Sequence, residues 1–385
     1  MFPLRAKTLT DPIAFIDLQA QRRRLGEPLN VAIKSAVEGG QWVLGPQVTE
    51  LEKRLAEFVG VKHCISCANG TDALMIVLRA WGVGPGNAVF VPAFTFAASA
   101  EVVALVGAEP VFVDIFEDTY NMDPASLEAA IALVKRDGKL KPRAVMPVDL
   151  FGQPADYRKL EPIVRREKLL LLCDAAQGFG GLLDGRRSGG IGDAAATSFF
   201  PAKPLGCYGD GGAVFTNDGA LDELLRSIRM HGQGCDRYEN VRIGVNSRLD
   251  TIQAAILLEK LKVFSDEIDM REAVARRYND AFRASNKIRI PHVIDGARST
   301  WAQYTIQISD REKFQADLKA KGVPTAVYYP IPLSRQKGYQ HFPSAPTPVS
   351  ERVCDTVVSL PMHPDLDAVT QGRIIEAVLA SVGQS

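Results

Sequence analysis

From about residue 63 onwards, short apolar runs alternate with longer segments that carry apolar residues at helical spacing. The runs are HCISCA (63–68), AVFVPAF (88–94), PVFVDI (110–115), AVMPVDLF (144–151), LLLLCDAA (169–176), ATSFF (196–200) and GAVFTN (212–217). Because most of them are apolar at successive positions, both faces of each predicted strand would be buried. This is typical of a sheet that helices cover on both sides.

Four helix-length segments separate these runs: residues 71–81, 97–108, 124–138 and 156–168. Strands that alternate with helices predict a mostly parallel sheet of about seven strands in an α/β fold. Ligands of such folds bind at the carboxyl ends of the strands. The residues just after each run are therefore the first candidates for a functional site.

The pattern changes near Asn246. A helix with at most one break is predicted from residue 247 to about 282. It is followed by weaker strands at YTIQI (304–308) and TAVYY (325–329), and by a last helix from about residue 368. We therefore predict an amino-terminal arm (1–24), a large domain (25–255) and a smaller carboxyl-terminal α/β domain (256–385).

Composition narrows the class of protein. The 385 residues include 45 basic and 45 acidic side chains, so the formal net charge is zero. This balance indicates neither nucleic-acid binding nor a polybasic membrane anchor. No apolar run approaches the roughly 20 residues of a membrane helix. The start, MFPLRAKTLTDP, lacks the layout of a signal peptide, so we expect a cytoplasmic protein whose six cysteines are reduced.

Several motifs are weak. Cys64-x-x-Cys67 has no second pair at zinc-site spacing, so no metal is expected. No GxGxxG follows the first strand, and no P-loop lysine is present, which argues against a Rossmann oxidoreductase. His231 and His363 are possible general bases, although a lone histidine is more often structural.

Three features at strand ends carry more information. The first is the turn Asn69-Gly70-Thr71-Asp72, between a strand and a helix. Its glycine would let the backbone approach a ligand closely. The amide groups and the Thr71 hydroxyl at the helix start would hold a phosphate, with help from the helix dipole. The alternative is an ordinary helix N-cap.

The second feature is Asp174, which follows LLLLC. A carboxylate in such apolar surroundings needs a partner. It either caps the start of a helix or pairs with the cationic ring nitrogen of a cofactor. Gln177 lies one helical turn further on and would point the same way.

The third feature is the stretch from Ser198 to Gly212, SFFPAKPLGCYGDGG, in which Lys203 lies just past a strand end among aromatic residues and glycines. Burial disfavours the charged form of a lysine and makes its amine nucleophilic. A surface lysine in a loop is the alternative. A phosphate cradle, an aspartate for a pyridinium and a Schiff-base lysine together are the groups that pyridoxal phosphate requires.

The chain resembles the sugar aminotransferases of the DegT/DnrJ/EryC/StrS family, which have the aspartate aminotransferase fold (fold type I). The resemblance runs from FIDLQAQ to SLPMHPDLD and rests on the motifs GQWVLGPQVTELE, CANGTDAL, DAAQ, SFFPAKPLGCYGDGGA and GVNSRLDTIQAAIL. It implies that Lys203 forms the Schiff base and shuttles the proton, and that Asp174 keeps the pyridine nitrogen protonated. The resemblance assigns cofactor contacts to Gly70, Thr71, Phe96, Gln177, Ser198 and, across a homodimer interface, Asn246.

Within the family, KPLGCYGDGGA and GVPTAVYYPIPL are most similar to the bacterial branch that aminates UDP-2-acetamido-2-deoxy-3-oxo-glucuronate. The implied donor is L-glutamate, and the implied pathway is surface polysaccharide (O-antigen) synthesis. Arg248, Tyr328 and Tyr329 would then lie near the sugar or a carboxylate. The closest branch would have His at position 328, so another nucleotide keto sugar, such as a 4-keto dTDP- or GDP-sugar, stays open.

Two other activities are compatible with the family. Its dehydratases replace the lysine by histidine, whereas Lys203 is present here. A silent regulatory member would be expected to lack Lys203 or Asp174, and both are retained.

Overall fold

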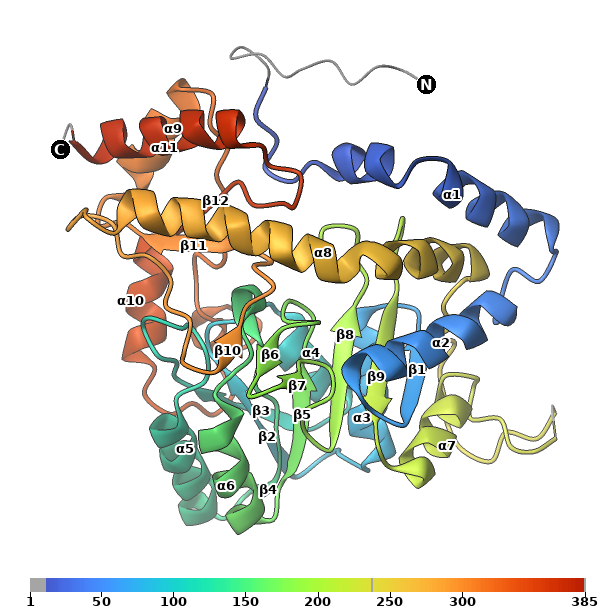
Figure 1. The fold of residues 1–385 in the computed structure, drawn as a ribbon. Helices are drawn as coiled ribbons and strands as arrows, with labels where there is room; N and C mark the ends of the chain where they lie inside the picture. Colours follow the sequence, from blue (N-terminus) through green and yellow to red (C-terminus); the bar gives the residue numbers. More distant parts are fainter. Residues whose placement is uncertain (1–11, 237, 384–385) are drawn as a thin grey trace.

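The computed structural model describes residues 12–236 and 238–383, and its centre is a seven-stranded sheet (Figure 1). The strand order is β1-β9-β8-β5-β4-β2-β3. The strands are β1 (His63–Cys67), β2 (Asn87–Pro92), β3 (Glu109–Val113), β4 (Lys141–Val145), β5 (Leu170–Asp174), β8 (Ala194–Ser198) and β9 (Gly212–Thr216). Only β9 runs antiparallel to its neighbours in this sheet. The predicted, mostly parallel seven-stranded sheet is confirmed.

Helices cover both faces of this sheet (Figure 1). One apolar cluster joins the strands to α2 (Pro46–Val59), α5 (Pro124–Asp137), α6 (Tyr157–Glu167) and α8 (Thr251–Phe282). The other joins them to α3 (Gly70–Ala80), α4 (Ala98–Leu105) and α7 (Gly219–Ile228). Neighbouring residues of β2 alternate between the two, with Phe90 in the first cluster and Val91 in the second. This is why the strand sequences are apolar without a break.

The carboxyl-terminal part has its own apolar cluster, which includes Tyr278, Tyr304, Val358 and Ile374. It contains β11 (Tyr304–Gln307) paired with β12 (Val357–Leu360), α9 (Arg311–Ala320), α10 (Pro348–Thr356) and α11 (Ala368–Gly383). A small sheet pairs β6 (Leu182–Leu183) and β7 (Arg186–Arg187), which lie between β5 and β8 in the sequence, with β10 (Ala297–Arg298), which follows α8.

The strand predicted at YTIQI is confirmed as β11, whereas the strand predicted at TAVYY is wrong. There, only Ala326 forms a bridge, to Ser359. Prolines at positions 324 and 330 flank the segment, and a proline cannot donate a ladder hydrogen bond. The β-prone residues between them are therefore held in an irregular segment.

The long helix α8 is unbroken from Thr251 to Phe282, and the predicted domain boundary at residue 255 falls inside it. Helix α1 (Leu18–Glu38) lies along α8 and is interrupted at Gly26, whose φ is 60° (Figure 1). Residues 1–11 of the predicted arm lie outside the described residues, and residues 18–24 begin α1. The division into arm and two domains stays a prediction. Within the described ranges, no helix combines the length and apolarity needed to cross a membrane.

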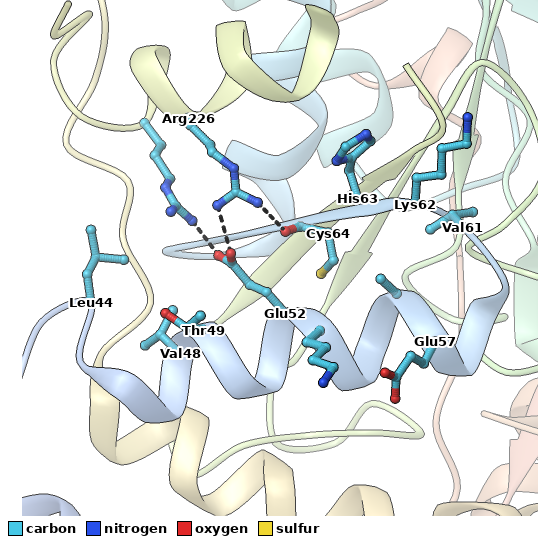
Figure 2. Close-up of a pocket in the computed structure, with 13 residues that line it drawn as sticks. Leu44, Val48, Thr49, Glu52, Glu57, Val61, Lys62, His63, Cys64 and Arg226 are labelled. Atoms are coloured by element: carbon cyan, nitrogen blue, oxygen red, sulfur yellow. Dashed lines mark hydrogen bonds and ion pairs between the residues drawn. The ribbon is translucent and has the colours of Figure 1, made fainter. Parts of the chain in front are cut away.

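A buried carboxylate ties α2 to β1 and α7. Glu52 accepts a hydrogen bond from Arg226 at 2.8 Å (Figure 2). It also accepts hydrogen bonds from Arg229 at 2.6 Å and from the Ser66 amide at 2.9 Å. Glu52 and the two arginines line a hollow of about 630 Å³, together with His63 and Cys64. Those two residues begin β1, so the hollow opens away from the carboxyl ends of the strands.

Candidate active site

The predicted site residues converge on one edge of the sheet. Asp174 ends β5 and Ser198 ends β8, and these two strands are parallel neighbours. Lys203 follows β8 in a loop, and the Asn69-Gly70 turn follows β1, which runs in the same direction as β8. The carboxyl ends of these strands therefore bring the three features together, as the fold predicts.

The turn after β1 is shaped for an anion. The Asn69 side chain caps α3 by accepting the Asp72 amide at 2.8 Å, so the N-cap interpretation holds for this residue. Gly70 and Thr71 precede the first intrahelical hydrogen bonds, which leaves their amides for another acceptor. A Cβ atom at Gly70 would lie 2.6 Å from the Cβ atom of Ser198. Only glycine lets the start of α3 pack this closely against Ser198, which brings the free amides of Gly70 and Thr71 beside the Ser198 hydroxyl, a set of donors that fits a phosphate group.

Asp174 is buried, with 5% of its surface exposed. Its carboxylate accepts a hydrogen bond from the Ser99 hydroxyl at 2.9 Å and one from the Ala176 amide at 3.2 Å. Burial raises its pKa, and these two bonds and the charge of Lys203 oppose that rise. Within the described part of the chain it has no ion-pair partner at contact distance. A cationic ring nitrogen would supply one.

Burial lowers the pKa of the Lys203 amine, and the Asp174 carboxylate opposes that effect. The backbone amide of Lys203 donates to the Phe200 carbonyl at 2.8 Å, which fixes the start of the loop. Among the described residues the amino group has no hydrogen bond or ion pair. A partly buried, unpaired amine close to a buried carboxylate fits the carbonyl group and the pyridinium of pyridoxal phosphate.

Gln177 and Phe96 meet at Tyr329. The Gln177 side chain accepts the Phe151 amide at 2.9 Å and donates to the Tyr329 hydroxyl at 3.2 Å. The Phe96 ring is 55% exposed, and its centroid lies 6.3 Å from that of Tyr329. The neighbouring Tyr328 ring is partly buried, 6.4 Å from Phe15. The structure therefore brings Gln177, Phe96 and Tyr329 together.

The segment of Asn246 and Arg248 adjoins the cradle. Ser247, between them, is fully buried, and its hydroxyl accepts the Ala68 amide at 3.1 Å, just before the Asn69-Gly70 turn. Asn246 itself is exposed and Arg248 is partly exposed. Neither side chain forms a hydrogen bond or ion pair with another described residue. Both remain available to a ligand or to a second chain.

Two residues beside the site were not predicted from the sequence to have a role. Ser99 lies in a segment that was predicted only as a helix, although its hydroxyl donates to Asp174. Asp149 is fully buried and accepts hydrogen bonds from the Tyr157 hydroxyl at 2.7 Å, the Ala155 amide at 2.9 Å and the Ser188 hydroxyl. Burial raises the pKa of Asp149 to about 6. The available signal was its position at a strand end, like that of Asp174. No cluster of potential metal ligands occurs in residues 12–236 and 238–383.

Proteins of known sequence and structure resemble this chain over nearly its whole length. A relative from Pseudomonas aeruginosa, a UDP-2-acetamido-2-deoxy-3-oxo-D-glucuronate aminotransferase, is 50% identical over 96% of this chain and 100% of its own length. The crystal structure of a DegT DnrJ EryC1 StrS aminotransferase from Brucella abortus superposes with a TM-score of 0.94 at 53% identity, covering 96% of this chain and 99% of that one.

A third match bears on the cofactor. The structure of ntda from Bacillus subtilis with bound cofactor PMP has a TM-score of 0.89 at 28% identity, covering 99% of this chain and 87% of that one. PMP is the amino form of pyridoxal phosphate, and the predicted fold and cofactor are confirmed. The family profile matches residues 24–379. The chain therefore belongs to the DegT/DnrJ/EryC1/StrS aminotransferase family.

Proposed function

We propose that this protein uses pyridoxal phosphate to convert a keto group of a nucleotide-activated sugar to an amine, with L-glutamate as donor. The observation that carries the proposal is the pair of Asp174 and Lys203 at one sheet edge, where burial shifts the two pKa values in opposite directions. The proposed sugar is UDP-2-acetamido-2-deoxy-3-oxo-glucuronate, the substrate in the name of the relative at 50% identity.

Each residue has a defined task in this proposal. Gly70, Thr71 and Ser198 hold the phosphate, Asp174 keeps the pyridine nitrogen protonated, and Phe96 packs against the ring. Gln177 contacts the ring oxygen and also donates to Tyr329. When bound, the cofactor withdraws electrons from the substrate carbon. Lys203 would hold the cofactor at its carbonyl carbon and, once the donor amine has displaced it, its free amine would act as the base that moves the proton from the substrate carbon to the cofactor.

The sugar and the donor require further groups. Arg248 offers a guanidinium, which suits a carboxylate of the donor or of a uronate. Tyr328 and Tyr329 follow on a segment that reaches Gln177 through the Tyr329 hydroxyl. Asn246 is proposed to reach the phosphate of the neighbouring subunit in a homodimer with shared sites. The proposed setting is cytoplasmic synthesis of a surface polysaccharide such as O-antigen.

The visible absorption spectrum with pyridoxal phosphate tests the chemistry. We expect a yellow band from the lysine-bound cofactor, which bleaches when L-glutamate is added. A band that does not respond to glutamate contradicts the donor assignment. Absence of any band contradicts the site assignment as a whole.

A second substrate class has one observation in its favour. Tyr328 stands where the branch that acts on the uronate would have histidine. A panel of UDP-, dTDP- and GDP-linked 3-keto and 4-keto sugars, offered to the bleached enzyme, separates the candidates. Return of the yellow band identifies the accepted sugar, and return only with a 4-keto dTDP- or GDP-sugar would replace the uronate assignment.

A further inference from the structure

The loop from residue 199 to 211, which carries Lys203, folds back on itself. The Cys207 amide donates to the carbonyl of Phe199, the first residue of the loop, at 2.7 Å. At the tip, a Cβ atom on Gly206 would lie 2.5 Å from the Pro201 carbonyl oxygen. The loop is therefore tightly packed, and a shift of its second half would be transmitted to Lys203.

Two side chains of α8 bind this second half. Gln253 accepts the Tyr208 amide at 2.8 Å and its amide group donates to the Tyr208 carbonyl at 3.4 Å. Lys260 donates to the Gly206 carbonyl at 2.5 Å, and its ammonium lies 4.5 Å from the centroid of the Tyr208 ring. Positions 253 and 260 are about two helical turns apart, so both project from one face of α8.

Among the residues that the structure describes, Lys260 is buried without the ion-pair partner that a buried lysine in a structural role would need. Only 1% of its surface is exposed, and burial lowers its pKa to about 8. Within the described ranges no carboxylate lies at ion-pair distance from it. Glu267, whose charge acts on it, is itself bound by Gln21 and Arg24. A methionine would fill similar space without the cost of burying an amine, so what the lysine adds at this position is its bond to the loop.

We propose that Lys260 and Gln253 are positioning residues for the reaction. They fix the loop backbone at residues 206 and 208, and so hold the Lys203 amine in line with the site at Asp174. This inference rests on the role proposed for Lys203. Misplacement of a reacting group by about 1 Å lowers a rate by about a hundredfold. The phosphate cradle lies on other elements, so the affinity for the cofactor should change little.

Three variants test the inference, with a matched control. Lys260→Met and Gln253→Met remove the contacts, whereas Gln253→Glu keeps the acceptor for the Tyr208 amide. The control is Lys262→Met, on the same helix, where the lysine is exposed and pairs with Glu259. The measurements are kcat and KM with L-glutamate, the pH midpoint of the visible absorption band, the cofactor Kd and the melting temperature.

We expect both methionine variants to lose about ten- to a hundredfold in kcat with little change in KM, and to shift the pH midpoint of the band. Gln253→Glu keeps only the bond from the Tyr208 amide, so its kcat should fall between those of wild type and Gln253→Met, whereas Lys262→Met should stay close to wild type. Unchanged kcat and an unchanged midpoint, with or without a lower melting temperature, overturn the inference. If Lys260→Met does not fold, the two Gln253 variants decide alone. A wild-type protein without a visible band would instead refute the function proposed for Lys203.

Discussion

Asp174 and Lys203 occupy positions where burial penalises the charge of each. Each is a stabilising influence on the charged form of the other, yet no ion pair at contact distance joins them among the described residues. A ligand that places a positive ring nitrogen on Asp174 and a carbonyl carbon on Lys203 satisfies both residues together. The positions of Asp174 and Lys203 thus determine, before any substrate binds, which end of such a ligand lies at each residue.

Replacement of Lys203 by alanine should separate binding from turnover. We expect the Lys203→Ala variant to retain the cofactor through the cradle and to lose transamination by at least about a thousandfold, within the range of general acid–base effects. Equilibrium dialysis of pyridoxal phosphate and single-turnover kinetics with L-glutamate measure the two properties. Appreciable residual turnover would remove Lys203 from its assigned role.

Gly70 offers a steric test of the cradle. In a Gly70→Ala variant the added methyl group would meet Ser198 at 2.6 Å, so the backbone must move or the anion space must shrink. We expect the displaced amides to bind the phosphate less well, so the affinity for pyridoxal phosphate should fall by about tenfold, as for the loss of about one hydrogen bond to a charged group. Gly338→Ala is the control, because its Cβ atom would meet nothing within 4 Å. Equal cofactor affinity in the two variants would contradict the cradle.

The site residues that could be predicted from the sequence are those placed by the neighbouring strand alone. Asp174, Ser198 and Lys203 follow strand ends, and strand ends can be inferred from periodicity and neighbouring glycines. The sequence did not predict Ser99 or Lys260, whose partners are 75 and 54 positions away along the chain. Such contacts depend on how helices dock on the sheet, which a pattern of apolar residues does not specify.

At the scale of elements, the contact of α2 with β1 and α7 depends on a charge. Glu52 is buried between two arginines. Burial alone would raise its pKa, but the charges and hydrogen bonds of the arginines hold the pKa below the ordinary value. Breaking a buried ion pair from one side leaves unpaired charge and costs more than the pair contributes in net stability. The packing of these three elements should therefore be sensitive to Glu52 and to acid.

We expect Glu52→Gln to lower the free energy of unfolding by about 3 kcal/mol at neutral pH. Because the folded pKa is lowered, the contribution of Glu52 is present above its unfolded pKa of about 4.3 and is lost as the pH falls through the folded value. The gap between wild type and variant should therefore narrow in acid. Urea unfolding at pH 7 and at about pH 3, well below the unfolded pKa, measures this.

The control for this prediction is Glu57→Gln on the same helix. Glu57 is exposed and its ion pair is with Arg54, at 3.5 Å, so its replacement should change stability by less than about 1 kcal/mol. A gap for Glu52→Gln that stays constant between pH 7 and about pH 3 would show that the carboxylate charge is not the source of its stability.

The elements themselves were predictable to different degrees. The seven strands of the large sheet were predictable because they are buried on both faces and need continuous apolar sequence. The segment at TAVYY has the same β-prone residues but lacks a partner strand along its length. Strand β12 went unpredicted, because VVSL is too short to distinguish from the end of the preceding helix.

At the scale of the whole molecule, the proposed homodimer can be tested by complementation. Lys203→Ala and Asn246→Ala chains are each expected to be impaired as homodimers. If a site takes Lys203 from one chain and Asn246 from the other, a mixed dimer contains one fully wild-type site. Its transamination rate per dimer should therefore recover to about half that of wild type. No recovery in the purified mixed dimer would place both residues in the same chain's site.

Helix α8 limits how this protein can be recombined with its relatives. Its 32 residues form a rod of about 48 Å that contributes Phe264 to the core beneath the large sheet and Tyr278 to the carboxyl-terminal core. A chimera joined near residue 255 would divide this rod between two parents and mismatch both cores at once. In a chimera joined after residue 283, beyond the end of the helix, α8 and the loop of residues 199–211 that it binds come from the same parent protein. Exchange of substrate preference between family members by recombination should therefore succeed only where α8 is inherited whole.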